Sequence, residues 1–255
     1  MPRMWEVVHD MKLCLAGTYS REFLRDEIEK SKYILESFWY FKPWQIPFIK
    51  SCDLFLLDSG AFTFMNTARD NVDWDAYLNR YISFVNQYDV DHFFELDIDS
   101  IVGYEKVKQM TAKLERETGK QCIPVWHINR GKDEFIRLCE EYDYIAFGGI
   151  AIGEISKDSV IKYAPQFIKI AHQHNCKIHG LGFTDVKTFN NVRFDSVDST
   201  TWLAGSKYGR LFHFTGNTIK SYSVPKGYKT THYREMDSFN LRNWMKFQNY
   251  ATIHL

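Results

Sequence analysis

Short apolar runs alternate along the chain with longer stretches in which apolar residues recur at helical spacing. The short runs, which are rich in β-branched and aromatic residues, predict buried strands. We expect strands at 11–17, 53–61, 92–99, 121–128, 144–152, 177–182 and 194–200. The longer stretches between them predict helices at 21–40, 74–87, 105–117, 133–142 and 159–174.

Repetition of strand and helix is typical of a parallel sheet. Seven or eight such units in 255 residues, without a break in composition, favour a single-domain (β/α)8 TIM barrel over an open doubly wound sheet. Segment 211–224 supplies either the eighth strand or a hairpin that turns at Thr215, Gly216 and Asn217. We expect residues 1–204 to form the barrel core and residues 205–255 to be a basic, aromatic-rich C-terminal segment that completes it.

Composition and charge narrow the class of protein further. The 32 basic and 32 acidic residues cancel, which excludes a uniformly basic nucleic-acid binder but leaves room for a local patch. Five cysteines are dispersed without a CxxC pair, which is typical of reduced thiols in the cytoplasm. No secretory signal and no run of 18 apolar residues is present, so we expect a soluble cytoplasmic protein without a membrane contact.

Six predicted strands end in polar or glycine-rich residues: DSGAF, ELDID, WHINR, FGGIAIGE, HGLGFT and VDST. In a barrel these ends meet at one face, where active sites lie. Neither GxGxxG after the first strand nor the phosphate loop GxxxxGK(S/T) occurs, so the common nucleotide-binding folds lack support. The sequence therefore predicts a site built from strand ends rather than from a phosphate loop.

Asp58 and Asp198, each at a strand end, are the strongest catalytic candidates. Two carboxylates on one barrel face allow one to attack a carbon while the other moves protons. A nucleophilic carboxylate is typical of displacement at an anomeric carbon. A lone aspartate at a strand end instead often caps the following helix, and that alternative stays open for each of the two.

Asp97 and Asp99 alternate with Glu95 in ELDID, so we expect the three side chains to point the same way. An inward carboxylate is costly unless it meets a donor. A guanine-like ring offers N1–H and an amino group side by side, and a neighbouring lysine or arginine offers the alternative.

Other strand-end residues are weaker candidates for contacts with a flat ligand. Gly148 and Gly149 expose backbone that such a ligand can approach, or allow close packing. His127 and His179 donate to a ligand, flank a ring, or are structural. Phe62, next to the DSG turn, is a stacking platform or a core residue.

Residues 205–250 show a shift in charge. They contain eight basic residues against two acidic ones, with ten aromatic residues interleaved. The basic residues are Lys207, Arg210, Lys220, Lys226, Lys229, Arg234, Arg242 and Lys246. Cations for phosphates and rings for bases are the usual mixture in nucleic-acid binding, and a solvated terminal face is the alternative.

Four of these motifs, in order, resemble those of the tRNA-guanine transglycosylase superfamily. They are DSGAF at 58–62, GGIAIGE at 148–154, HGLGFT at 179–184 and FDSVDS at 194–199. The chain is most similar to the phage and bacterial branch that acts on DNA, the 7-deazaguanine DNA transglycosylases. The resemblance implies a TIM-barrel pentosyltransferase without a redox cofactor.

Catalytic roles follow from the resemblance residue by residue. Asp198 matches the nucleophile and Asp58 the general acid/base. Phe62 matches the aromatic residue that sandwiches the base. Asp99, or Asp97 if the register slips by two, matches the carboxylate that reads N1–H and the amino group.

Further positions of the motifs match substrate-binding residues. Gly148 and Gly149 match the backbone that meets the carbonyl oxygen of the base. Ser59 and Gly60 of the first motif and Gly180 of the third belong to the same expected pocket. Asp195 matches the preceding aspartate of the nucleophile strand, and its role is left open.

The chain also departs from the family. His127 stands where glutamine is usual and His179 where methionine is usual. No cysteine follows Cys176, so the zinc site of the tRNA enzymes has no ligands here and we expect no metal. No separate RNA-binding domain is evident after Asp198, which favours DNA over tRNA as the substrate.

The sequence thus predicts an enzyme that exchanges guanine in DNA for a 7-deazaguanine base, such as the 7-cyano form, through a covalent intermediate on Asp198. Lys207 and Arg210 would clamp the flanking phosphates. One alternative is a zinc-free enzyme that acts on tRNA. Another is a barrel that binds a 7-deazapurine or a partner protein without catalysis. Whether the enzyme needs a partner subunit is left open.

Overall fold

The computed structural model describes residues 10–64, 72–150, 153–225 and 227–255. Three residues named above are affected: Lys226 lies outside the described residues, as do the side chains of Phe62 and Lys229. Residues 1–9, to which the expectation about a secretory signal refers, also lie outside them. Within the described ranges, no helix is both long enough and apolar enough to cross a membrane.

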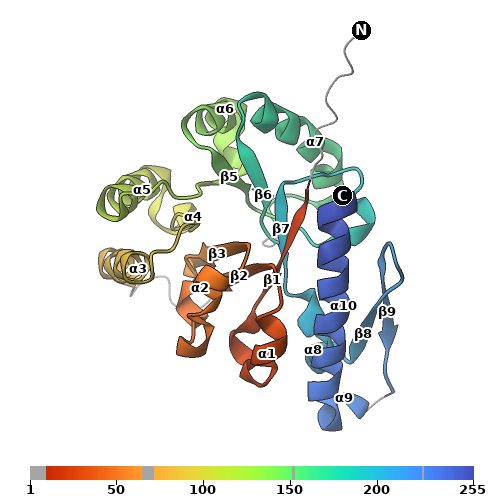
Figure 1. Ribbon diagram of the computed structural model, residues 1–255. Coiled ribbons are helices and arrows are strands. Elements are labelled where there is room, and N and C mark those ends of the chain that lie inside the picture. Colours follow the sequence, from red (N-terminus) through yellow and green to blue (C-terminus); the bar gives the residue numbers. More distant parts are fainter. Residues whose placement is uncertain (1–9, 65–71, 151–152, 226) are drawn as a thin grey trace.

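Seven parallel strands curl around a common centre in the order β3-β2-β1-β7-β6-β5-β4 (Figure 1). Their bounds are β1 Lys12–Ala16, β2 Tyr33–Ser37, β3 Leu54–Asp58, β4 Val125–Trp126, β5 Tyr144–Phe147, β6 Lys177–Gly180 and β7 Ser196–Ser199. The order places the first and last strands of the barrel side by side, with Cys14 of β1 opposite Asp198 of β7.

A short extended segment closes the gap between β3 and β4. Leu57 of β3 pairs in parallel with Phe93, and Phe94 pairs in parallel with Ile123. The Phe94 amide donates to the Leu57 carbonyl at 2.9 Å, and the Ile123 amide donates to the Phe93 carbonyl at 2.8 Å. This segment takes the place of the eighth barrel strand. The (β/α)8 TIM barrel predicted from the sequence is therefore confirmed.

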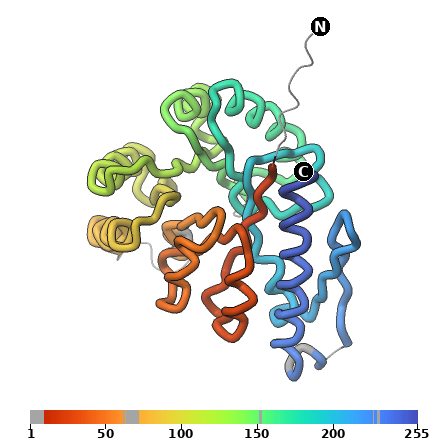
Figure 2. Tube along the Cα trace, in the orientation of Figure 1, coloured from red at the N-terminus to blue at the C-terminus, as the bar shows by residue number. Residues whose placement is uncertain are grey.

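Helices surround the strands, as the tube of Figure 2 shows. Their bounds are α1 Arg25–Ile28, α2 Phe48–Ser51, α3 Trp74–Tyr88, α4 Asp99–Val102, α5 Tyr104–Thr118, α6 Gly131–Glu141, α7 Lys157–Gln173, α8 Ala204–Tyr208, α9 Tyr228–Thr231 and α10 Tyr233–His254. The helices expected at 74–87, 105–117, 133–142 and 159–174 are confirmed within a few residues, because each has a clear apolar face.

The helix expected at 21–40 is wrong. The α-helix in this range is the short α1, and strand β2 occupies 33–37. Tyr33 and Leu35 face the barrel interior, whereas Ile34 packs on the outer core. This alternation over YILES is the period of a strand, and it was hidden inside a stretch whose flanks read as helical.

Of the two alternatives for segment 211–224, the hairpin is the one that the structure shows, and the segment is not a barrel strand. Strands β8 Arg210–Phe214 and β9 Ile219–Ser223 pair antiparallel in a separate sheet. The Thr215 amide donates to the Thr218 carbonyl at 2.9 Å and closes the turn at the predicted place. Figure 1 shows this hairpin outside the barrel, beside α10.

Helix α10 lies along the outside of β1, and buried polar side chains fix it there. The Gln248 amide nitrogen donates to the carbonyls of Leu13 at 2.8 Å and Tyr33 at 2.9 Å. Asn240 accepts from the Phe212 amide of β8 at 2.8 Å and so holds the hairpin to the same helix. The C-terminal segment therefore covers the barrel from outside.

The barrel interior is filled by a small apolar cluster. Its buried members are Cys14, Ala16, Tyr33, Leu35, Leu54, Leu56, Phe94, Ile123, Val125 and Ala146. These side chains fill the space that the strands enclose. The polar residues that follow them at the strand ends therefore lie above a closed floor.

Candidate active site

A cavity of about 310 Å³ opens at the carboxyl ends of the strands. This volume is at the lower end of the range for small-molecule sites, about 300–1,000 Å³. The lining residues are Ala16, Gly17, Tyr19, Leu35, Ser37, Tyr40, Asp58, Ser59, Gly60, Thr63, Asp97, Gly149, Leu181, Gly182, Asp198 and Thr200. Three carboxylates and several hydroxyl groups therefore share one small space.

Asp58 is the last residue of β3 and lies half-buried in the cavity wall. Burial raises the pKa of its carboxyl group to about 7, and the nearby charges of Asp97 and Asp198 add to that rise. The Gly60 amide, which donates to Asp58 Oδ2 at 3.0 Å, lowers the pKa only in part. Asp58 can therefore hold or release a proton near neutral pH, as a general acid/base must.

Asp198 lies on β7 and presents its carboxylate to the same cavity. Its Oδ1 accepts from the Gly182 amide at 2.5 Å and lies 3.3 Å from His179 Nε2. Among the described residues, no hydrogen bond to Oδ2 occurs. One oxygen is thus fixed by the protein while the other is available to a ligand.

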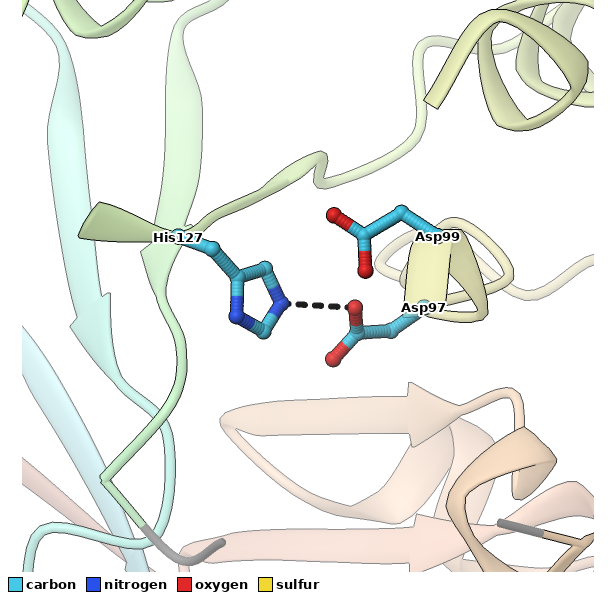
Figure 3. Close-up of side chains that lie close together, drawn as sticks. All are labelled: Asp97, Asp99 and His127. Carbon is cyan, nitrogen blue, oxygen red and sulfur yellow. Dashed lines mark hydrogen bonds and ion pairs between the residues drawn. The ribbon is translucent and has the colours of Figure 1, made fainter. Parts of the chain in front are cut away.

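Asp97 is held by a buried histidine (Figure 3). His127 Nε2 lies 2.7 Å from Asp97 Oδ1, and Nδ1 lies 2.7 Å from Glu154 Oε2. Burial by itself lowers the pKa of His127, but the two carboxylates outweigh it and raise the pKa to about 9. At neutral pH His127 is therefore an imidazolium that positions Asp97 at the cavity wall.

Asp99 does not reach the cavity. It begins α4, and its Oδ2 accepts from Arg130 Nε at 3.1 Å and from Nη2 at 3.0 Å. The carboxylates of Asp97 and Asp99 still lie near each other, in one group with His127 (Figure 3), but Asp99 is turned to Arg130. The Ile98 amide donates to the Leu96 carbonyl at 2.9 Å, and this turn breaks the alternation, leaving only Asp97 at the cavity.

Of these two aspartates, only Asp97 lines the cavity. Asp99 takes the alternative of an arginine partner, and Glu95 accepts from Thr111 of α5 at 3.0 Å. Burial raises the pKa of the Glu95 carboxyl group, and the Arg130 charge opposes that rise.

Asp97, Asp99 and His127 place three possible metal-ligand atoms within 4.8 Å of one another, the one such group among the described residues. Figure 3 shows the Asp97 carboxylate directed at the imidazole. A metal ion here would have to displace the imidazolium proton from Asp97 and compete with Arg130 for Asp99. The existing ion pairs already neutralise the group, so we assign it no metal.

The glycines of the motifs have different roles. Gly60 has φ of 74°, and a Cβ there would lie 2.6 Å from Ser37 Oγ, so the turn after Asp58 requires glycine. A Cβ on Gly148 would lie 3.0 Å from the His127 ring, so only glycine lets this ring sit beside the strand. Gly180 is needed for packing, because a Cβ would lie 2.5 Å from the Phe194 ring, and Gly180 does not line the cavity.

Ser59 and Ser37 each have a buried hydroxyl group with no hydrogen-bond partner among the described residues. Both residues line the cavity. Buried polar groups are normally satisfied, so two unsatisfied hydroxyl groups at one cavity favour a polar ligand there.

Asp195 lies at the opposite end of the barrel from Asp198. It precedes β7, and its Oδ2 accepts from the Ile178 amide at 2.7 Å and lies 3.0 Å from His172 Nε2. The two aspartates lie toward opposite ends of β7, and Asp195 does not line the cavity. Asp195 therefore does not contact a ligand there.

Two further predicted residues make no contact with the cavity. Lys207 on α8 and Arg210 on β8 follow β7, are exposed and do not line the cavity. The side chain of Phe62 lies outside the described residues, so its stacking role stays a prediction.

Sequence reasoning missed an aromatic pair at the cavity. Tyr19 and Tyr40 stack with ring centroids 4.7 Å apart and an angle of 13° between the planes, and both line the cavity. Tyr40 follows β2, so the helix predicted over 21–40 concealed it. The alternation of YILES, followed by the aromatic run FWY, is the signal that could have revealed β2 and, at its end, Tyr40.

No protein-family model and no curated protein matches this sequence. The structure is similar to a putative fructose-1,6-biphosphate aldolase from Coccidioides immitis, with a TM-score of 0.50 and 11% identity over 96% of this chain and 90% of that one.

Two other similarities are weaker. Muconate lactonizing enzyme from Pseudomonas putida has a TM-score of 0.41 and 8% identity over 67% of this chain and 45% of that one. The carboxyl transferase domain of Rhizobium etli pyruvate carboxylase has a TM-score of 0.45 and 12% identity over 95% of this chain and 48% of that one. The chain spans less than half the length of these two. The similarity to the aldolase shows the fold alone, and none of the three proteins is a transglycosylase.

Proposed function

We propose that this protein is a base-exchange transglycosylase that replaces guanine in DNA with a 7-deazaguanine base. The observation that carries the proposal is the pairing of Asp58 and Asp198 in one cavity. Asp58, with a pKa raised to about 7, is suited to moving protons, and Asp198 has one carboxylate oxygen without a protein partner.

The first half of the reaction removes guanine. Asp198 Oδ2 attacks C1′ of a nucleotide that has left the base stack, because a stacked nucleotide does not fit the mouth of a barrel. The C1′–N9 bond breaks with its electrons going to N9, and the protonated Asp58 supplies the proton. A glycosyl ester on Asp198 results, with the sugar inverted at C1′.

The second half inserts the new base. Asp58, now a carboxylate, takes the proton from N9 of the 7-deazaguanine, and N9 attacks C1′. The C1′–O bond to Asp198 breaks, and a second inversion restores the original configuration. The same carboxyl group thus gives and takes one proton, which is why a pKa near 7 suits both halves.

The cavity also offers contacts for recognition of the base. The imidazolium of His127 orients the Asp97 carboxylate, which can accept N1–H and the amino group of a guanine-like ring. The hydroxyl groups of Ser37 and Ser59 are free for the remaining polar edge. Tyr19 and Tyr40 supply an aromatic surface on which a base can stack.

The test is incorporation of radiolabelled guanine into single-stranded DNA, duplex DNA and unmodified tRNA, measured in parallel. We expect label in DNA with the wild type, and a loss of at least about a hundredfold in Asp198→Ala. Asp53→Ala is the matched control, because Asp53 is exposed just before β3, at the opposite end of the barrel. Label in tRNA alone would assign the tRNA substrate, and no label in any of them, with a 7-deazaguanine tried as acceptor, would favour a binding protein.

A further inference from the structure

A chain of hydrogen-bonding side chains runs through the barrel interior to Asp198. Tyr144 OH contacts Ser196 Oγ at hydrogen-bond distance, and Ser196 Oγ lies 2.5 Å from His179 Nδ1. His179 Nε2 then lies 3.3 Å from Asp198 Oδ1. His179 is fully buried and Ser196 is 1% exposed, so the two middle members of the chain are shielded from solvent.

The direction of each hydrogen bond follows from its end at Asp198. The Asp198 carboxylate accepts from the Gly182 amide at 2.5 Å, and it accepts a second hydrogen bond at the same oxygen only if His179 Nε2 carries a proton. In the neutral ring Nδ1 is then the acceptor for the Ser196 hydroxyl proton, and Ser196 Oγ accepts from Tyr144. Asp198 Oδ1 accepts two hydrogen bonds, and each proton of the chain is donated once.

The other end of the chain supports this direction. Burial raises the pKa of the Tyr144 phenol, so Tyr144 keeps a proton that it can donate to Ser196 Oγ. The reverse direction would place an unprotonated Nε2 against a carboxylate oxygen, so two acceptors would face each other.

His179 also differs from the other buried histidine of the site. His127 has a carboxylate on each ring nitrogen, whereas His179 has one carboxylate and one hydroxyl group. The edge of the Phe94 ring packs against the imidazole, with centroids 5.4 Å apart, and fixes its plane. The imidazole is thus held on three sides by the barrel interior.

We propose that His179 is a positioning residue for the nucleophile, held by Ser196 and Tyr144 in the tautomer with its proton on Nε2. His179 and Gly182 together fix Oδ1 of Asp198, so that Oδ2 faces the cavity in the orientation for attack. Because a carboxylate nucleophile has no proton to lose, His179 does not act as a base; it serves as the orienting member of the group.

This role in attack rests on the proposed function, whereas the hydrogen-bond chain does not. Histidine at position 179 stands where the resembling family has methionine, so the arrangement belongs to this chain rather than to that family. His179→Gln keeps an N–H that can reach Asp198, and His179→Leu removes it, so the two variants separate the hydrogen bond from the packing.

The first experiment is ¹⁵N NMR of the wild-type protein labelled at its nine histidines, with the His179 signals assigned by His179→Gln. We expect His179 at neutral pH as the neutral tautomer protonated on Nε2, and a shift of the tautomer balance in Ser196→Ala. A tautomer protonated on Nδ1, an imidazolium, or no response to Ser196→Ala would overturn the proposal.

The second experiment measures exchange in the same variants. We expect Ser196→Ala to lower kcat about tenfold with KM unchanged, since one hydrogen bond to the orienting group is lost. His179→Leu should lose more, and His179→Gln should recover most of that loss. Equal activity of His179→Leu and the wild type would overturn the positioning role. The expected NMR behaviour without exchange on any nucleic acid would leave the chain standing and refute the proposed function.

Discussion

Replacing His127 with glutamine removes a buried positive charge from between two carboxylates. The imidazole is 1% exposed, and each ring nitrogen lies 2.7 Å from an oxygen of Asp97 or Glu154. Glutamine keeps hydrogen-bonding capacity at this position but carries no charge. The variant therefore tests whether His127 is the imidazolium that the geometry indicates.

The magnitude follows from the pKa. Burial lowers the pKa of His127, but the carboxylates raise it from 6.5 to about 9 overall. Each unit corresponds to about 1.4 kcal/mol, so the charge contributes roughly 3 kcal/mol to the free energy of unfolding. Because the folded-state pKa is raised, this contribution is complete below pH 6.5 and is lost as the pH rises through about 9.

The assay is urea unfolding of the wild type and His127→Gln at steps from pH 6 to pH 9. We expect the variant to be less stable by about 3 kcal/mol at pH 6 and the two curves to approach each other toward pH 9. The difference between the proteins isolates His127, because His172, whose pKa is raised by Asp195, adds the same slope to both. His213→Gln, which changes an exposed imidazole on β8, is the control and should follow the wild type.

Curves that stay parallel from pH 6 to pH 9 would refute the reasoning. Such a result would mean that folding does not shift the pKa of His127, so the two carboxylates would not hold the imidazole as a cation at neutral pH.

Three further predictions concern single side chains. Asp58→Asn should slow adduct formation at Asp198 by about 10²–10⁴ in single-turnover assays and abolish its decline as the pH rises through about 7, since guanine departure needs the protonated acid. Glu36→Gln should raise the free energy of unfolding by up to about 3 kcal/mol at pH 8 but not at pH 4.5 in urea titrations. The reason is that burial raises the pKa of Glu36 to about 7, which makes its carboxylate form destabilising as the pH rises from 4.5. Gly60→Ala should cost about 1–3 kcal/mol in thermal unfolding, because φ is 74° and the new Cβ would meet Ser37 Oγ at 2.6 Å.

The barrel could be predicted from the sequence where burial is one-sided or complete. Runs such as DLFLLD and YIAF are apolar because both faces of a barrel strand are covered, and four of the five expected helices have a clear apolar face. Strand β2 was not predicted, because charged residues lie next to it in the sequence and its outer face carries the buried Glu36.

Helix α10 could not be predicted from apolar periodicity. Its buried face carries Asp237, Asn240 and Gln248, which bind backbone groups of α8, of the hairpin and of the first strand. Such partners lie far away in sequence, and a pattern of apolar residues does not record them.

The candidate site was predictable at its strand ends but not in its details. Asp58 and Asp198 share a cavity as expected, because the ends of parallel strands converge. The choice between Asp97 and Asp99 depended on one turn at Ile98 and on the position of Arg130, and neither follows from alternation.

The most direct test of the account is intact-protein mass spectrometry after incubation with guanine-containing DNA in the absence of an acceptor base, followed by denaturing quench and peptide mapping. A glycosyl enzyme predicts a mass increase equal to the DNA strand without one guanine, located on Asp198 and absent from Asp198→Ala. An unmodified protein under conditions in which labelled base is exchanged, or an adduct at another residue, would contradict the assignment of Asp198 as the nucleophile.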